Sequence, residues 1–144
     1  MEQLVEKRLH QNGVGELIAA WQDAILALDA DRTVANYAAE AIYEDPAAAN
    51  DERYPEVRTG HDAIRSLYEG IFSLPRVSFA FVSSFVAADG RAAAVEWVWC
   101  GDRLDCGDEY EIRGLSLLRL GDGRITHETI YYDTSYAPYQ VTAR

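Results

Sequence analysis

The sequence predicts an α+β fold in which three helices pack on one face of a mainly antiparallel sheet. Apolar residues recur at helical spacing in the first half, and segments rich in β-branched and aromatic residues fill the second half. Asp-Gly pairs, which favour tight hairpins, separate two of those segments from the next. Helices gathered before strands are typical of α+β folds. With 144 residues, one domain with its own core is expected.

The first helix is predicted over about residues 16–28, because Leu17, Trp21 and Ile25 follow one another at four-residue spacing. The preceding segment, residues 1–13, is polar and ends in Asn-Gly. We expect it to form a flexible arm that can include a helical turn.

A second, shorter helix is predicted to carry Val34, Tyr37, Ala38 and Ala41 inward. It leads into a brief strand over residues 42–45. There the run Ile42-Tyr43-Glu44-Asp45-Pro46 puts a carboxylate at the end of an apolar strand, just before a chain-breaking proline. Residues 46–58 show no periodicity and are predicted to be a surface loop.

The third helix is predicted to begin at the N-cap pattern Thr59-Gly60-His61-Asp62 and to end before Pro75. Four strands follow, over residues 77–87, 92–100, 110–120 and 125–133. The pairs Asp89-Gly90 and Asp122-Gly123 fall between strands, so the four strands are expected to form an antiparallel meander.

Composition limits the function classes. The formal net charge of −11 argues against nucleic acid and anionic membranes as partners, since both require clustered Lys and Arg. Cys100 and Cys106 are read as reduced thiols of a cytoplasmic protein. No apolar stretch approaches a membrane span. No metal-ligand spacing, phosphate-binding loop or dinucleotide fingerprint occurs in the sequence, so neither a metal nor another cofactor is expected.

Several short motifs, taken in order, resemble one superfamily. They are Tyr43-Glu44-Asp45-Pro46, Gly60-His61-Asp62-Ala63-Ile64-Arg65, Gly114 to Leu120, Asp122-Gly123-Arg124-Ile125 and Tyr131-Tyr132-Asp133. The resemblance is to the nuclear transport factor 2-like superfamily, in its SnoaL-like polyketide cyclase and ketosteroid isomerase branch.

The resemblance implies a single SnoaL-like domain over residues 1–144, with its core at about 15–135. It implies a cone-shaped, strongly bent mixed sheet that encloses a pocket together with three N-terminal helices. It also implies a small apolar organic ligand and a homodimer formed through the outer sheet face.

The resemblance places Asp45 where the isomerases keep their proton-moving aspartate, and Tyr68 where they keep a supporting helix tyrosine. The other two isomerase positions, which supply oxyanion donors, fall near Asp23 or Ala24 and near Ser116. Neither keeps the donor that stabilises an enolate. Steroid isomerisation itself is therefore not expected.

The cyclase-like alternative uses a carboxylate on the last strand, where Asp133 stands. Alternation puts His127, Thr129, Tyr131 and Asp133 on one face, and we expect that face to meet the pocket. The opposite face then carries Glu128, Ile130 and Tyr132.

Each candidate also has a purely structural interpretation. Asp45 could cap an Asp-Pro turn, Asp133 could face solvent, and His127 could be a hydrogen-bonded sheet histidine. Trp97 and Trp99 share a face and could line a pocket or simply pack in the core. Arg113 and Arg119 are assigned to the outer face, which disfavours an epoxide hydrolase-like Asp-Arg-Asp site.

The favoured function is a cofactor-free acid/base isomerase, cyclase or lyase acting on an apolar carbonyl-bearing or polycyclic molecule. The alternatives are a non-catalytic ligand-binding or accessory dimeric protein, and a dimerisation module whose pocket is filled by its own side chains. The candidate catalytic residues are Asp45, Asp133, His127 and Tyr43, and the candidate pocket residues are Trp21, Tyr68, Trp97, Trp99, Ser116 and Tyr131.

Overall fold

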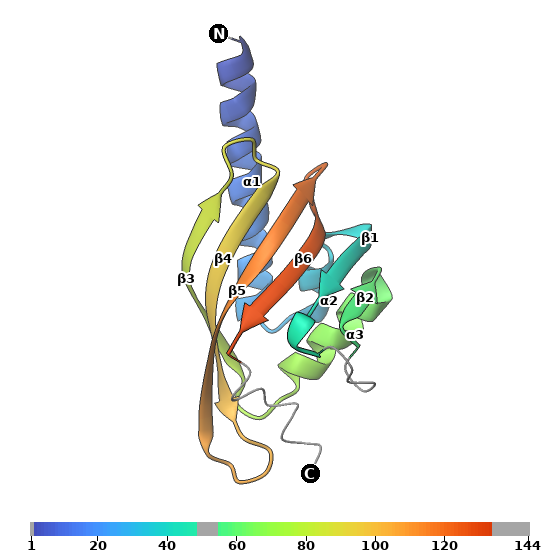
Figure 1. The fold of residues 1–144 in the computed structure, drawn as a ribbon, viewed down its shortest axis with the longest axis vertical. Helices are drawn as coiled ribbons and strands as arrows, with labels where there is room; N and C mark the ends of the chain where they lie inside the picture. The colour runs from blue at the N-terminus through green and yellow to red at the C-terminus, as the bar shows by residue number, and fades with distance from the viewer. Residues whose placement is uncertain (1, 49–54, 134–144) are drawn as a thin grey trace.

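The described part of the chain forms a curved six-stranded sheet and three helices (Figure 1). The computed structural model describes residues 2–48 and 55–133, with only the backbone described for residues 2–12. The helices are α1 (Glu2–Leu26), α2 (Ala30–Val34) and α3 (His61–Phe72), with a 3-10 turn η1 (Pro46–Ala48). The strands are β1 (Tyr37–Glu44), β2 (Val57–Thr59), β3 (Ser78–Val86), β4 (Ala92–Asp102), β5 (Glu109–Gly121) and β6 (Arg124–Tyr132).

The sheet is mixed, in the order β2-β1-β6-β5-β4-β3. The pairs β3–β4, β4–β5 and β5–β6 are antiparallel, which confirms the predicted meander. Strand β1 joins the sheet parallel to β6, with Tyr43 beside Glu128, and β2 pairs antiparallel with β1. The predicted α+β class and mixed, mainly antiparallel sheet are therefore confirmed.

The helix α1 includes the predicted segment but begins earlier. It runs back to Glu2, where the sequence predicted a flexible arm, and this part extends beyond the sheet in Figure 1. Nothing before Gly13 strongly opposes a helix, and a glycine inside one costs only about 1 kcal/mol relative to alanine.

The second helix is shorter than predicted, and the assignment of Tyr37, Ala38 and Ala41 to it is wrong. It ends at Val34, and those three residues belong to β1. The side-chain amide of Asn36 donates to the carbonyl of Arg32 at 3.0 Å, just beyond the helix end. Pairing of β1 with β6 then overrides the weak helical preference of an alanine-rich segment.

The third helix lies where the sequence predicts it, but its cap differs. Gly60, with φ 87°, is the N-cap residue and makes no side-chain hydrogen bond, whereas Thr59 ends β2. A β-branched residue is strained at such a φ, whereas glycine is not. The predicted loop 46–58 contains η1 and most of β2, and its residues 49–54 lie outside the described part.

The β5–β6 hairpin confirms the tight turn predicted from Asp122-Gly123. Asp122 (φ 51°) and Gly123 (φ 72°) are the two residues between the strands, and both have positive φ. This is the backbone of a type I′ turn, whose twist matches that of the flanking strands. Together with the register shift between Arg119 and Leu120, this turn sets the pairing of β6 with β5.

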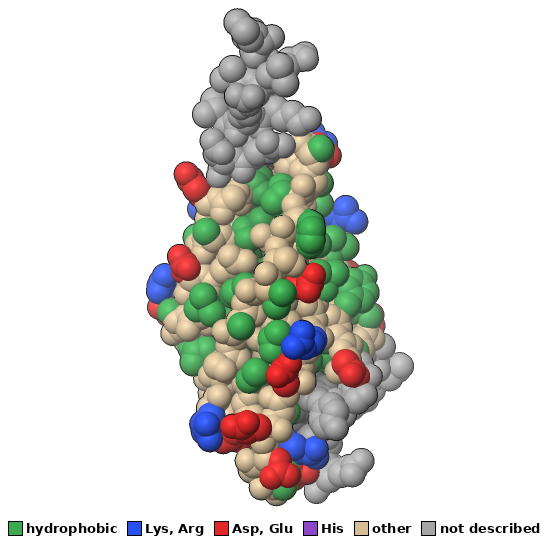
Figure 2. Space-filling view, turned by 90° about the vertical axis from the view of Figure 1, so that its left-hand side faces the viewer, with side chains coloured by type: hydrophobic (Ala, Val, Ile, Leu, Met, Phe, Trp, Pro, Cys, Tyr) green, Lys and Arg blue, Asp and Glu red, His purple; other side chains and the backbone are tan. Residues whose placement is uncertain are grey.

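The surface is mixed in charge. On the side shown in Figure 2, hydrophobic side chains alternate with acidic and basic ones, and no basic cluster stands out. Among the described helices, none is long and apolar enough to cross a membrane. Homodimerisation through the outer sheet face stays a prediction.

Candidate functional site

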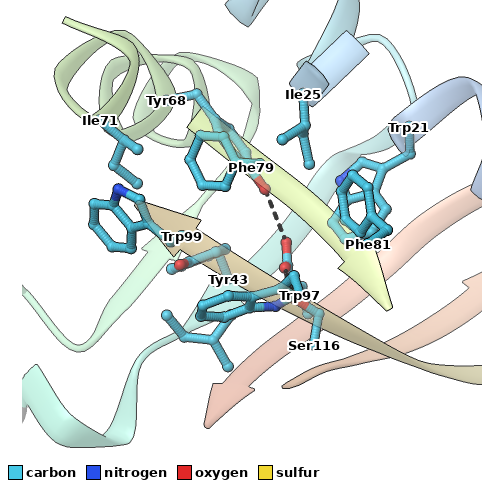
Figure 3. A pocket seen from close by; sticks show the side chains of 12 residues that line it. Trp21, Ile25, Tyr43, Tyr68, Ile71, Phe79, Phe81, Trp97, Trp99 and Ser116 are labelled. Atoms are coloured by element: carbon cyan, nitrogen blue, oxygen red, sulfur yellow. Dashed lines mark hydrogen bonds between the residues drawn. The ribbon is translucent and has the colours of Figure 1, made fainter. Parts of the chain in front are cut away.

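An inner cavity of about 50 Å³ lies between the helices and the sheet (Figure 3). Every strand from β3 to β6 contributes to its wall, together with β1, α1 and α3. Aromatic rings form most of that wall, and the polar exceptions are few. The lining residues are Trp21, Ile25, Tyr43, Tyr68, Ile71, Phe79, Phe81, Trp97, Trp99, Ser116, Glu128 and Ile130.

The carboxyl group of Glu128 is 1% exposed and lies at the centre of a hydrogen-bond network. The Tyr37 hydroxyl donates to Oε1 of Glu128, and the Tyr68 hydroxyl lies 3.2 Å from the same oxygen. The Ser116 hydroxyl donates to Oε2 at 2.6 Å. The two tyrosine oxygens are 2.7 Å apart. Hydroxyls from β1, α3 and β5 thus converge on one acid.

Two indoles extend the network. The N–H of Trp21 donates to the Tyr37 hydroxyl at 3.0 Å, and the N–H of Trp97 donates to the Ser116 hydroxyl at 2.9 Å. Since indole nitrogens only donate, both fix the direction of the hydrogen bonds beyond them. The tyrosine and serine hydrogens are thereby free to point toward Glu128.

Glu128 accepts all three hydroxyl hydrogens of the network, from Tyr37, Tyr68 and Ser116. Burial raises the pKa of Glu128, while hydrogen bonds from Ser116, Tyr37 and Tyr68 lower it in part. None of the described residues lining the inner cavity is Lys, Arg or His. Glu128 therefore lacks a counter-charge there.

An outer cavity of about 170 Å³ adjoins the inner one. Tyr43, Ile71, Trp99 and Ile130 line both, so only side chains separate the two spaces. Arg58 is the one cationic side chain among the described lining residues of the outer cavity. The remaining wall is formed by Asp45, Ala48, Pro55, Ser66, Leu67, Gly70 and Leu74.

Asp45 brings a carboxylate to this cavity. It is 8% exposed, its Oδ2 accepts a hydrogen bond from Tyr132 at 2.9 Å, and its Oδ1 accepts one from the backbone N–H of Ala47 at 3.1 Å. Burial raises the pKa of Asp45, and these hydrogen bonds, with one involving the Ala48 backbone, lower it in part. The turn-capping and cavity-lining interpretations of Asp45 therefore both hold. A carboxylate can accept about four hydrogen bonds, so the two roles are compatible.

Tyr43 stands between the two carboxyl groups and is 6% exposed. Its hydroxyl makes no hydrogen bond to the described residues, unlike those of Tyr37 and Tyr68. Burial raises the pKa of Tyr43 well above its usual value, with further contributions from Glu128, Tyr68 and Asp45. It is therefore a neutral donor at the boundary of the two cavities.

The structure brings most predicted site residues together. Trp21, Tyr43, Tyr68, Trp97, Trp99 and Ser116 line the inner cavity, and Asp45 lines the outer one.

The face predicted for the last strand is wrong. Glu128 and Ile130 point inward, while Tyr131 is 51% exposed and Asp133 is exposed. His127 lines neither cavity, and its Nε2 lies 3.1 Å from a carboxylate oxygen of Glu44. The outward assignment of Arg113 and Arg119 is confirmed.

Sequence reasoning missed Glu128 and Arg58. The sequence prediction gives the pocket face of the last strand to His127, Tyr131 and Asp133, which puts Glu128 on the opposite face. Arg58 falls in the segment predicted to be a surface loop. One signal favoured the inward assignment of Glu128: alternation puts it on the same strand face as Ile130, an aliphatic residue. No described group of His, Cys, Asp or Glu is arranged to hold a metal.

The family of the chain follows from its sequence. The SnoaL-like domain family matches residues 17–128, which is more than half of the chain. The protein is a member of the SnoaL-like domain family. No protein of curated function matches the chain.

Solved structures support the same fold. A protein of ketosteroid isomerase-like fold from Catenulispora acidiphila, in complex with trimethylamine, is 21% identical, with a TM-score of 0.72 over 90% of this chain and 94% of that one. A candidate polyketide cyclase from Xanthomonas campestris is 20% identical, with a TM-score of 0.73 over 92% and 98%. An NTF2-like protein of unknown function from Burkholderia pseudomallei is 14% identical, with a TM-score of 0.77 over 91% and 98%. These similarities establish an NTF2-like fold.

Proposed function

We propose that this SnoaL-like protein is an acid/base enzyme of the isomerase, cyclase or lyase type. Its substrate is a small apolar molecule that carries a carbonyl group and binds in the outer cavity. The observation that supports this most is Asp45, a buried carboxyl group with a raised pKa in a largely apolar wall. A base with a pKa nearer the working pH transfers protons more efficiently.

Asp45 accepts a proton from the carbon next to the carbonyl group. The C–H bond breaks, its electron pair forms the enolate, and negative charge develops on the carbonyl oxygen. Tyr43 donates a hydrogen bond to that oxygen, and the guanidinium of Arg58 offsets its charge. The protonated Asp45 then returns the proton to a carbon of the enolate, which completes the cycle.

The volume of the outer cavity limits the size of the substrate. An apolar protein cavity of about 150 Å³ binds benzene. At about 170 Å³, the outer cavity suits a molecule with one ring. A polycyclic ligand would also need the inner cavity and a shift of Tyr43 or Ile71, which line both. We therefore favour a monocyclic ketone over a polycyclic one.

The reaction class is tested by hydrogen exchange, which requires no knowledge of the product. Cyclohexanone and cyclohex-2-enone are incubated with the protein in D₂O, and loss of the α-hydrogen signals is followed by proton NMR. We expect exchange faster than in buffer, in proportion to protein concentration. Exchange at the buffer rate for both ketones would overturn the proposed activity on monocyclic carbonyl compounds.

The pH dependence of this exchange reports on Asp45. The base must be ionised, so the rate should rise with pH and reach half its maximum above the ordinary aspartate pKa of about 3.9. The Tyr132 hydroxyl stabilises the ionised form. Tyr132→Phe should therefore shift the midpoint to higher pH. A midpoint that stays in place or moves to lower pH would contradict this assignment, and Tyr131→Phe, at an exposed position, is the control.

A further inference from the structure

We propose that the inner cavity binds the methylated ammonium head group of a small organic cation, with Glu128 as its counter-charge. This subsite is separate from the chemistry proposed for Asp45. Three features of the cavity support it: its aromatic wall, its single acid and its volume.

The wall offers aromatic faces from several directions (Figure 3). The ring centroids of Trp21 and Phe81 are 5.7 Å apart, and those of Phe79 and Trp99 are 6.0 Å apart. Cations are attracted to such faces, and aromatic cages recognise methylated ammonium groups in this way. The rings that line the cavity belong to Trp21, Tyr43, Tyr68, Phe79, Phe81, Trp97 and Trp99.

The acid gives this cage a preference for positive charge. Glu128 is fully enclosed and has no cation among the described lining residues. Without a counter-charge it keeps its proton, because an isolated buried carboxylate is costly. An entering cation makes the ionised form favourable, and Tyr37, Tyr68 and Ser116 are already placed to donate to that carboxylate. A neutral ligand would not favour the ionised form of this acid.

The volume and polarity of the cavity favour a methylated head group. About 50 Å³ exceeds the roughly 10–15 Å³ that one water needs but is far below the roughly 150 Å³ of a cavity that binds benzene. An unmethylated ammonium would require three acceptors. Here the hydroxyl oxygens of Tyr37 and Ser116 already accept indole hydrogens, so methyl groups against the rings suit the site better. Larger substituents would extend past Tyr43 into the outer cavity.

Binding is measured by NMR titration with dimethylammonium chloride, following the indole N–H signal of Trp97. That N–H donates to Ser116, which donates to Glu128, so it senses charge at the acid. We expect a saturable shift with dimethylammonium and none with propan-2-ol at equal concentrations. An absent or linear response to the cation, or an equal response to propan-2-ol, would overturn the proposal.

Variants separate this charge effect from simple packing. Glu128→Gln should weaken dimethylammonium binding by about tenfold or more, because the counter-charge is lost. Glu44→Gln removes the same charge beside His127, outside both cavities, and should leave binding unchanged. Equal effects of the two variants would refute the site.

A second variant covers the case in which Glu128→Gln does not fold. Phe81→Leu keeps an apolar side chain but removes one ring and should weaken binding about threefold. Unchanged binding in Phe81→Leu would argue against an aromatic cage. Asp45→Asn should bind the cation as the wild type does, so failure of this subsite is distinguishable from failure of the proposed acid/base activity.

Proton release provides an independent readout. The titratable groups that face Glu128 are Tyr37 and Tyr43 from β1 and Tyr68 from α3. The pKa of each is raised well above the usual tyrosine value, so all three stay neutral. Cation binding should therefore release a proton from Glu128 alone, visible calorimetrically as a dependence of the binding heat on the buffer's ionisation enthalpy. Binding without proton release would contradict the proposed counter-charge role.

Discussion

Asp45→Asn is expected to slow exchange of the ketone α-hydrogens by about 10²- to 10⁴-fold, the usual contribution of a positioned general base. Asparagine has nearly the same shape, and its carbonyl oxygen can still accept the hydrogen bond from Tyr132 or from the N–H of Ala47. The fold around β1 and η1 should therefore persist. What is lost is the ability to accept a proton from carbon.

Asp133→Asn is the matched control for this substitution. Asp133 is exposed at the end of β6, and it was the other aspartate to which the sequence assigned a role. We expect its replacement to leave the exchange rate unchanged. If Asp133→Asn abolished exchange while Asp45→Asn did not, the cyclase-like assignment would replace the one proposed here.

Gly114→Ala is expected to destabilise the protein by about 1–3 kcal/mol or more, which is the usual cost of overpacking a core. Gly114 on β5 is paired with Trp97 on β4, and the indole lies over the glycine. A Cβ at this position would stand closer than 3.0 Å to three atoms of that indole. The ring cannot easily move, because it is buried and held to Ser116 by its N–H.

Urea unfolding of Gly114→Ala and Gly15→Ala measures this effect. Gly15 lies on an exposed face of α1, and an added Cβ there meets nothing within 4 Å. Its replacement should be neutral or stabilise by up to about 1 kcal/mol, through helix propensity. Equal stability of the two variants would show that the Trp97 indole can move away from Gly114, which would contradict this prediction.

The sheet could be predicted because its signals are local. The Asp122-Gly123 turn and the alternation of Val95, Trp97 and Trp99 depend on neighbouring residues alone. Tyr37–Ala41 was misassigned because alanine-rich segments favour helices slightly, whereas pairing with β6 depends on residues far along the chain.

The site depends on distant contacts and was harder to predict. The alternation in β6 was correct, but alternation alone does not say which face is buried. Glu128 is tolerated inside because Tyr37, Tyr68 and Ser116 donate to it, and each comes from a different element. No local sequence pattern around Glu128 predicts those donors.

The parallel pairing of β1 with β6 has a consequence for how the protein folds. Tyr37 meets Glu128 across 91 residues of chain, and Asp45 meets Tyr132 across 87. Contacts this distant in sequence slow folding, because a long loop must close before they form. During synthesis β1 leaves the ribosome well before its partner strand exists. Glu128 and Asp45 therefore acquire these hydroxyl partners only when β6 joins the sheet. A truncated chain lacking β6 would form neither the Glu128 network nor the hydrogen bond between Asp45 and Tyr132.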